Sequence, residues 1–326
     1  MHQQPWVSNK ILAKAKVLVT GGAGFIGSHI AQYLLNHGAA MVRVLDNMSN
    51  GRLENIAILK QYPNFEFIEG DVRNMETCQL VASGITHITH QAALGSVPRS
   101  IANPTDSVST NVTGTVNILQ AAVLNNIRRV VFASSSSVYG DDDHLPKIEN
   151  IIGKPLSPYA ASKAGAEEFA AVFAKIHPGL QTIGLRYFNV FGPRQSPNGD
   201  YAAVIPKFIA AMLRGETVTI YGDGSYSRDF TYVENAVQGN IRALFTNNEN
   251  AYNQIFNVAA GGRFSLIELH RALQQLTKNP KPPEFAKNRP GDVPHSMANI
   301  EKAKLLLDFN PEVHFYEGLQ KTVASF

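Results

Sequence analysis

Short apolar runs and longer amphipathic segments alternate along the first 187 residues of the chain. Runs rich in Val, Ile, Leu and Phe predict buried strands, and they span residues 17–19, 42–45, 65–68, 85–90, 129–133 and 181–186. Apolar residues at helical spacing predict helices between these runs, beginning near residues 25, 75, 104 and 159. This order predicts an α/β fold, in which helices cover both faces of a parallel sheet.

The helix predicted at residues 104–125 has a long apolar stripe. The stripe consists of Val108, Val112, Val116, Leu119, Ala122 and Val123. Asn111 interrupts it, and a buried asparagine needs hydrogen-bonding partners. Two roles for Asn111 therefore stay open, a structural role and contact with a bound cofactor.

The pattern changes after residue 187. We expect two domains, residues 1–187 and residues 188–326, of which the second is smaller and closes over the ligand crevice. Residues 188–203 have the Gly, Pro and Asn content of a loop. Further elements are predicted as helices at 204–214, 266–276 and 300–307 and as strands at 218–221 and 255–258. The strand at 255–258 is expected to return to the main sheet.

Composition excludes several classes of protein for this chain. The 326 residues carry a net charge of +3, which is too small to indicate nucleic-acid binding. A single cysteine, Cys78, excludes an intrachain disulfide and is expected to be a buried thiol. The ten histidines lack metal-ligand spacing, so no metal site is expected. We see no signal-peptide pattern and no apolar run of about 18 residues, and we therefore expect a cytoplasmic protein without membrane contact.

A glycine-rich stretch joins the first strand to the first helix. It reads Thr-Gly-Gly-Ala-Gly-Phe-Ile-Gly and matches the dinucleotide-binding fingerprint of Rossmann-type folds. Glycine allows the tight turn and lets a diphosphate approach the backbone at a helix N-terminus. The cofactor contacts expected here are Gly21, Gly24, Phe25, Ile26 and Gly27. Asp46 ends the second strand 19 residues after Gly27, where a carboxylate binds the ribose of NAD and repels the 2′-phosphate of NADP.

Other candidate cofactor residues follow the remaining strands. Asn47 begins a polar loop that is expected to wrap the adenosine ribose. Asp71, beside Val72, ends the third strand, where it can meet the adenine amino group. The alternative for Asp71 is a helix N-cap for residues 75–81. The segment Gln91, Ala92 and Ala93 follows the fourth strand. Its small residues lie where the cofactor would pass.

A tyrosine and a lysine supply candidate chemistry. Tyr159 and Lys163 are four residues apart and share one helix face. An ammonium close to a phenol is expected to lower the pKa of the tyrosine towards neutral, which makes Tyr159 a usable general base or acid. Ser135 lies in a run of four serines at a strand end and is expected to bind the same substrate oxygen.

These motifs together resemble those of the extended short-chain dehydrogenases/reductases, and in particular the nucleotide-sugar 4-epimerases. The matching motifs are Thr-Gly-Gly-Ala-Gly-Phe-Ile-Gly27, Ser-Ser-Ser-Val-Tyr-Gly140, Tyr159-x-x-x-Lys163 and Arg186-Tyr-Phe-Asn-Val-Phe-Gly192. The resemblance covers Val17 to about Leu307. It implies an NAD-binding first domain, a UDP-sugar-binding second domain and a homodimer formed through a four-helix bundle of residues 104–125 and 159–175.

The resemblance also implies a mechanism. NAD takes a hydride from C4 of the sugar and returns it to the other face of a 4-keto intermediate. Tyr159 removes the proton of the 4-hydroxyl, Ser135 bridges that hydroxyl, and Lys163 holds the nicotinamide ribose. Asn189 would contact the substrate diphosphate, and Arg228 and Arg289 would neutralise it, although a lone surface arginine is more often a solvated charge. The other residues implied are Phe188 for the cofactor and Ser136, Ser137, Ala203, Val204, Tyr221 and Asp292 for the substrate.

One position near the C-terminus indicates which sugar substituent the protein can accept at C2. In 4-epimerases restricted to UDP-glucose and UDP-galactose, a bulky tyrosine limits the space around C2, and the matching position here is Ser296. Gly95 and Ser96 resemble residues of epimerases that prefer N-acetylated sugars. The resemblance thus implies a UDP-N-acetylglucosamine 4-epimerase that is less active on UDP-glucose.

Two other functions predict residues that can be looked for in the sequence. A nucleotide-sugar 4,6-dehydratase or decarboxylase of the same fold places an acidic residue beside the catalytic hydroxyl. Here Ser136 and Ser137 follow Ser135, and the first carboxylate after them is Asp141. A non-catalytic NAD-sensing module usually lacks the tyrosine or the lysine, and both are present here. The sequence therefore favours the epimerase.

Overall fold

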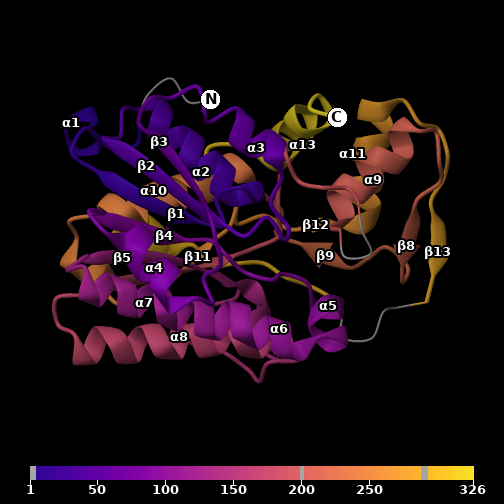
Figure 1. Ribbon diagram of the computed structural model, residues 1–326. Helices are drawn as coiled ribbons and strands as arrows, with labels where there is room; N and C mark the ends of the chain where they lie inside the picture. The colour runs from indigo at the N-terminus through magenta and orange to yellow at the C-terminus, as the bar shows by residue number, and fades with distance from the viewer. Residues whose placement is uncertain (1–4, 199–201, 288–292) are drawn as a thin grey trace.

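The computed structural model describes residues 5–198, 202–287 and 293–326 and has a seven-stranded parallel sheet at its centre (Figure 1). In order across the sheet, the strands are β11 (Gln254–Val258), β6 (Gln181–Tyr187), β5 (Arg129–Ser135), β4 (His87–His90), β1 (Lys16–Thr20), β2 (Met41–Asp46) and β3 (Phe65–Glu69). Every neighbouring pair is parallel. The predicted α/β fold is thus confirmed, and β11 lies at the sheet edge beside β6.

Helices cover both faces of the sheet, because the strands are apolar on both sides. On one face lie α2 (Phe25–Asn36) and α10 (Val233–Phe245), and on the other lie α4 (Met75–Ala82), α7 (Gly114–Leu124) and α8 (Pro158–Ile176) (Figure 1). In β1, Val17 and Val19 belong to the core cluster with α2 and α10, whereas Leu18 belongs to the cluster with α4 and α7. The strand's period of two thus divides the core into two layers.

The predicted helix 104–125 contains a π-helical turn. It comprises α6 (Pro104–Val108), the π turn Ser109–Thr113 and α7. The π turn holds Asn111, and such turns often occur at functional sites. A short helix before it, α5 (Val97–Ala102), was not predicted.

The helix α10 was also not predicted from the sequence. It buries Asn235, Gln238 and Asn240 as fully as its apolar residues. Because polar residues lie on its buried face, the sequence lacks the regular spacing of apolar residues that predicts a helix. Asn235 Nδ2, for example, donates a hydrogen bond of 2.7 Å to the Val313 carbonyl. Both α10 and β11 contact the main sheet although they follow residue 187. The division into two domains at that residue stays a prediction.

The remaining elements form a smaller lobe beside the sheet, on the right of Figure 1. They include β7 (Val190–Phe191), α9 (Val204–Leu213), β8 (Thr219–Tyr221), β9 (Ser227–Arg228), β10 (Thr231–Tyr232), β12 (Phe264–Ser265), α11 (Leu266–Thr277), β13 (Glu284–Ala286) and α13 (Phe315–Val323). Phe191, Phe230 and Phe315 contact one another within its core. Two further helices are α3 (Leu53–Ala57) and α12 (Glu301–Leu307), and α1 (Asn9–Leu12) precedes β1.

Two expectations from composition can be compared with the fold. Cys78 is a free, fully buried thiol, as predicted, and its Sγ donates to the Val72 carbonyl at 3.2 Å. Burial raises the pKa of this thiol to about 12. Across the described ranges, no helix combines the length and the apolar character needed to cross a membrane.

Candidate active site

The glycine-rich turn between β1 and α2 needs glycine for steric reasons. A Cβ at Gly21, which has φ of +68°, would lie 2.6 Å from the Ala92 nitrogen, and one at Gly27 would lie 2.2 Å from the Gly21 oxygen. The N-cap of α2 is Gly24, which makes no side-chain capping hydrogen bond. The first N–H groups of α2 are therefore available to an anion, as a dinucleotide diphosphate requires.

A cavity of about 400 Å³ opens at the carboxyl ends of the strands, beside this turn. Its lining includes most of the predicted cofactor residues, namely Gly21, Gly24, Phe25, Ile26, Gly27, Asp46, Asn47, Val72, Gln91, Ala92, Ala93, Tyr159 and Lys163. Gly95, predicted for the substrate, lines the same cavity. The cavity thus joins the glycine-rich turn to the candidate catalytic pair. Asp71, Asn111 and Phe188 were also predicted to bind the cofactor but do not line it.

Asp46 lies where a ribose-binding carboxylate is expected. Its Oδ2 accepts a hydrogen bond of 2.9 Å from the Ala23 nitrogen, and its Oδ1 accepts one of 2.9 Å from the Met48 nitrogen. Asp46 is 8% exposed, and burial raises the pKa of its carboxyl above the usual value. The side chain therefore orders the glycine-rich turn and the polar loop while it faces the cavity.

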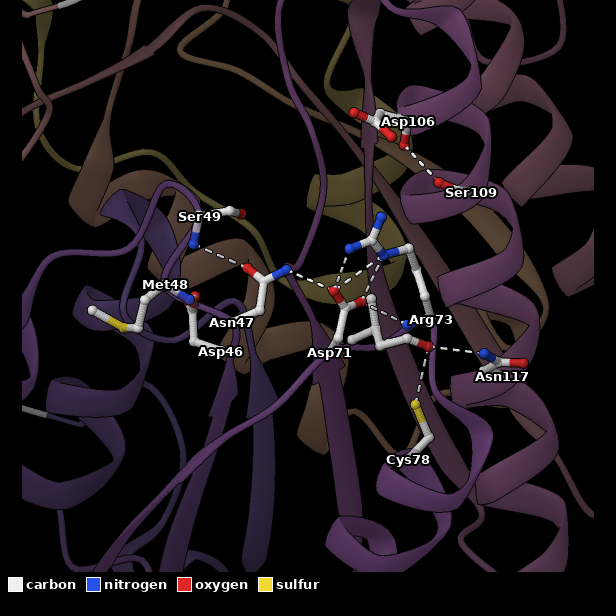
Figure 2. A network of polar contacts seen from close by, with 11 residues as sticks. Asp46, Asn47, Met48, Ser49, Asp71, Arg73, Cys78, Asp106, Ser109 and Asn117 are labelled. Carbon is white, nitrogen blue, oxygen red and sulfur yellow. Dashed lines mark hydrogen bonds and ion pairs between the residues drawn. The ribbon is translucent and has the colours of Figure 1, made fainter.

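Asp71 is held in a polar network beside the cavity (Figure 2). It accepts a hydrogen bond of 2.9 Å from Asn47 Nδ2 and forms an ion pair of 2.6 Å with Arg73. The hydrogen bonds from Arg73 lower the pKa of the Asp71 carboxyl to about 2. The alternative role as a helix N-cap is wrong, because Asn74 caps α4 by accepting from the Thr77 nitrogen at 2.8 Å.

Asn111 supports the cavity from behind. It is fully buried, its Oδ1 accepts a hydrogen bond of 2.8 Å from the Leu94 nitrogen, and its Nδ2 donates to the Leu94 carbonyl at 3.1 Å. Nδ2 also donates to Ser162 Oγ on α8 at 2.9 Å. These bonds fix the segment after β4 against α8. Of the two roles considered for Asn111 from the sequence, they support the structural one. Phe188, similarly, is fully buried in a core cluster.

The candidate catalytic groups come from two elements. Tyr159 and Lys163 lie on α8, and Ser135 ends β5. Lys163 is 4% exposed, and its Nζ donates a hydrogen bond of 2.9 Å to the Ala133 carbonyl. Ser135 Oγ accepts a hydrogen bond of 2.9 Å from Ser137 Oγ, in the 3₁₀ turn that also contains Ser136. Tyr159 and Lys163 line the cavity, whereas Ser135 does not line it but hydrogen-bonds to Tyr159.

The protonation of the catalytic pair differs from the expectation. Burial raises the pKa of Tyr159, and a hydrogen bond with Ser135 opposes this shift. Burial lowers the pKa of Lys163 to about 8, and the charge of Glu167 opposes it. The predicted lowering of the Tyr159 pKa is therefore wrong for the protein groups alone, because desolvation of the phenolate dominates.

Two predicted substrate residues, far apart in sequence, lie together. Asn189, with φ of +36°, donates a hydrogen bond of 3.3 Å from Nδ2 to Ser296 Oγ. Nearby, Arg228 Nη1 donates to the carbonyls of Ser227 and Pro294, both at 3.0 Å. Arg228 therefore holds the segment before Ser296 in place, a contact that the sequence did not predict.

The other predicted substrate residues are spread over the smaller lobe and its border. Ser96 caps α5 by accepting a hydrogen bond from the Arg99 nitrogen at 3.4 Å, so its hydroxyl has a structural partner. Ala203 and Val204 begin α9, and Tyr221 ends β8. Arg289 and Asp292 lie outside the described residues.

Arg194 lines the cavity and was not predicted. It follows β7 and lies opposite the N-terminal end of α2, where its guanidinium donates to Ser28 Oγ at 3.2 Å and to Gln32 Oε1. Burial lowers the pKa of Arg194 to about 10. The signal that could have found it is Pro193-Arg194, which directly follows the family motif that ends at Gly192. Arg194 is thus a cation of the cavity lining whose hydrogen bonds to α2 go to neutral side chains.

Comparisons with known proteins identify relatives of this chain. The profile of the NAD dependent epimerase/dehydratase family matches residues 17–259. A UDP-glucose 4-epimerase of Mycolicibacterium smegmatis is 37% identical over 313 residues, covering 95% of this chain and 98% of the relative. These matches extend well beyond the glycine-rich motif, over both the sheet and the smaller lobe.

Solved structures of similar fold also include 4-epimerases. A UDP-N-acetylglucosamine 4-epimerase of Methanobrevibacter ruminantium, in complex with UDP-N-acetylmuramic acid, has a TM-score of 0.90 and 38% identity, covering 96% of this chain and 98% of that one. A UDP-glucose 4-epimerase of Thermus thermophilus, in complex with NAD, has a TM-score of 0.85 and 36% identity, covering 95% and 98%. The predicted cofactor, NAD, is confirmed by the matched family and by its solved members that contain NAD.

Proposed function

Because this chain belongs to the NAD-dependent epimerase/dehydratase family, we propose that it is a UDP-N-acetylglucosamine 4-epimerase that also accepts UDP-glucose more weakly. It interconverts UDP-N-acetylglucosamine and UDP-N-acetylgalactosamine through a 4-keto intermediate. The observation that carries this proposal is the placement of Tyr159 and Lys163 in one cavity with the glycine-rich turn. We keep the cytoplasm as the expected compartment.

The side chains have separate roles in the proposed reaction. Bound NAD supplies the acceptor and donor of the C4 hydride. Tyr159 removes the proton of the 4-hydroxyl and returns it after the keto sugar has turned its other face. Ser135, which hydrogen-bonds Tyr159, orients that hydroxyl. Lys163 favours the phenolate by its positive charge and holds the nicotinamide ribose.

The serines after β5 favour epimerisation over dehydration or decarboxylation. Ser136 and Ser137 occupy the positions after Ser135 where the rival enzymes carry an acid. Glu167 reaches the same strand end, but Arg186 binds both of its carboxylate oxygens, at 2.9 and 2.7 Å. It does not line the cavity. A carboxylate committed in this way is a poor acid for chemistry at C5 or C6.

Ser296 supports the choice of an N-acetylated sugar. Its side chain is small and half-buried, and its hydroxyl lies 3.3 Å from Asn189 Nδ2. A small residue admits an acetamido group without rejecting a hydroxyl, so preference requires contacts that only the acetamido group makes. The Ser296 hydroxyl is a polar group suited to such contacts.

Product mass separates the candidate reactions in one experiment. The purified protein is incubated with UDP-N-acetylglucosamine, UDP-glucose or UDP-glucuronic acid, and products are analysed by chromatography and mass spectrometry. Epimerisation leaves the mass unchanged and moves the retention time. Loss of water indicates a dehydratase, loss of carbon dioxide indicates a decarboxylase, and no reaction with any sugar indicates a sensing module.

The expected homodimer has a candidate surface on α7 and α8. Apolar side chains are exposed on both helices, at Leu124 (51%), Phe169 (42%), Val172 (51%) and Ile176 (59%). These helices form the outermost layer on their side of the sheet (Figure 1). Pairing two such surfaces makes a four-helix bundle that buries them. Light scattering should give twice the chain mass for the wild type and the chain mass for Val172→Glu; a monomeric wild type would contradict the dimer.

A further inference from the structure

Glu167 connects the two elements that carry the candidate catalytic groups. It lies one helical turn beyond Lys163 on α8, and its side chain is 10% exposed. Ser134 Oγ, on β5, donates a hydrogen bond to Glu167 Oε1. Ser134 directly precedes Ser135 and directly follows Ala133, whose carbonyl accepts the hydrogen bond from Lys163. One carboxylate therefore joins α8 to β5 at the point where the catalytic groups meet.

We propose that Glu167 is a positioning residue of this active site, which keeps Lys163 in its ammonium form and fixes the end of β5 against α8. The inference rests on the proposed function, because it takes Lys163 as the charge that activates Tyr159. It assigns a role to a buried acid that makes no contact with the cavity.

The electrostatic part follows from burial. Lys163 is 4% exposed, and desolvation favours its neutral amine. The pKa of Lys163 is accordingly lowered to about 8, and the charge of Glu167 is what opposes that shift. Removing the carboxylate should lower the pKa of Lys163 further. The ammonium would then be lost at a pH at which the wild type still has it.

The other titratable groups around Lys163 do not replace Glu167. On its own helix, burial raises the pKa of Tyr159, which is the group that Lys163 acts on and not a source of negative charge for it. His90, at the end of β4, has its pKa lowered to about 3 by burial and by the charge of Lys163, so it is neutral. Tyr187, at the end of β6, is also neutral because burial raises its pKa. None of these three supplies negative charge to the ammonium at neutral pH.

The charged groups on the packed elements pair with Glu167 itself or with other partners. Arg186 of β6 pairs with Glu167 at 2.7 Å and donates to the Glu149 carbonyl at 2.9 Å. Arg99 of α5 donates to Asn50 at 2.9 Å, and Asp106 of α6 accepts from Asn103. Glu167 is therefore the acid that acts on Lys163.

The test uses Glu167→Gln, which keeps the size of the side chain and an acceptor for Ser134 but removes the charge. The alkaline limb of the kcat profile should move at least one unit to lower pH, while the KM for UDP-N-acetylglucosamine changes less than twofold. A purely structural role would instead lower kcat equally at every pH. Glu168→Gln is the matched control, because Glu168 is the exposed neighbour on the same helix, and its profile should equal the wild type.

A direct titration separates this inference from the proposed function. Lysine labelled with ¹³C at Cε reports each ammonium by NMR, and Lys163→Met identifies the Lys163 signal. The midpoint of Lys163 should fall in Glu167→Gln, whether or not any sugar is turned over. An unchanged midpoint would overturn the inference, whereas a shifted midpoint in a protein without epimerase activity would overturn only the proposed function. If the unpaired arginine prevents Glu167→Gln from folding, the Lys163 midpoint in Glu167→Gln/Arg186→Met is compared with that in Arg186→Met, because these two proteins differ only in the charge of Glu167.

Discussion

Asn189 and Ser296, 107 residues apart, are joined by a hydrogen bond of 3.3 Å between their side chains. Asn189 follows β6 at the ligand edge of the sheet, and its amide also donates to the Asp229 carbonyl at 3.2 Å. The Asp229 carboxylate, in turn, accepts from the Ala298 nitrogen at 3.1 Å. The segment that carries Ser296 is therefore fixed against the end of the sheet.

The first prediction concerns the size of residue 296. In Ser296→Tyr the aromatic ring should fill the space for an acetamido group, so kcat/KM for UDP-N-acetylglucosamine should fall at least about tenfold. The value for UDP-glucose should change little, because its C2 hydroxyl is small. Ser296→Ala is the control, since it removes the hydroxyl without adding volume. Unchanged N-acetyl turnover in Ser296→Tyr would show that Ser296 does not face C2.

The second prediction concerns cofactor retention by Arg194. Its guanidinium lines the cavity beside the N-terminus of α2, and its partners, Ser28 and Gln32, are neutral. A charge-assisted contact with the cofactor diphosphate contributes about 1.5–3 kcal/mol, so Arg194→Ala should bind NAD about 10- to 100-fold more weakly. The measurement is the NAD released on denaturing the purified protein, together with the Kd after reloading.

Arg43 offers a control for this prediction. Its guanidinium is paired with Glu66 at 2.7 Å and donates hydrogen bonds to the carbonyls of Val81 and Ser83. Arg43 does not line the cavity. Arg43→Ala should keep its NAD. Equal NAD content in Arg194→Ala and the wild type would remove Arg194 from the cofactor site.

The third prediction concerns stability in acid. His90 is 3% exposed, its Nδ1 lies 2.6 Å from Thr20 Oγ1, and burial lowers its pKa from 6.5 to about 3. Below pH 6.5 the unfolded chain binds a proton that the folded protein does not, so stability falls as the pH falls. Between pH 6.5 and 4.5 this amounts to about 2–3 kcal/mol.

Urea unfolding at both pH values measures this term. His90→Gln should lose less stability between pH 6.5 and 4.5 than the wild type does. His314→Gln should behave as the wild type, because the His314 side chain is exposed at the start of α13. The same acid dependence in all three proteins would contradict the prediction.

Local patterns predicted the sheet and most of the cofactor site. In β1, Val17 to Val19 are buried on both faces, and Gly27 is fixed by its close approach to Gly21 in the same turn. Such constraints act on neighbouring residues, so they leave a signature in the sequence. The same holds for Asp46, which ends β2 beside the glycine-rich turn.

Contacts between distant segments could not be predicted in this way. Asn74, rather than Asp71, caps α4, because Arg73 and Asn47 take the Asp71 carboxylate. The helix α10 was missed because it buries polar side chains that bond to the segment near Val313. The shift in the Tyr159 pKa depends on burial by the whole fold, and spacing to Lys163 alone gave the opposite sign.

The reaction proposed for this protein is the epimerisation of UDP-N-acetylglucosamine with internal return of the hydride. The most direct measurement incubates UDP-N-acetylglucosamine deuterated at C4 with the purified protein, without added NAD, and follows the product by mass spectrometry and NMR. We predict UDP-N-acetylgalactosamine that keeps its deuterium at C4, and no product from a folded Tyr159→Phe variant. Absence of the epimer, or a product with hydrogen at C4, would contradict the account.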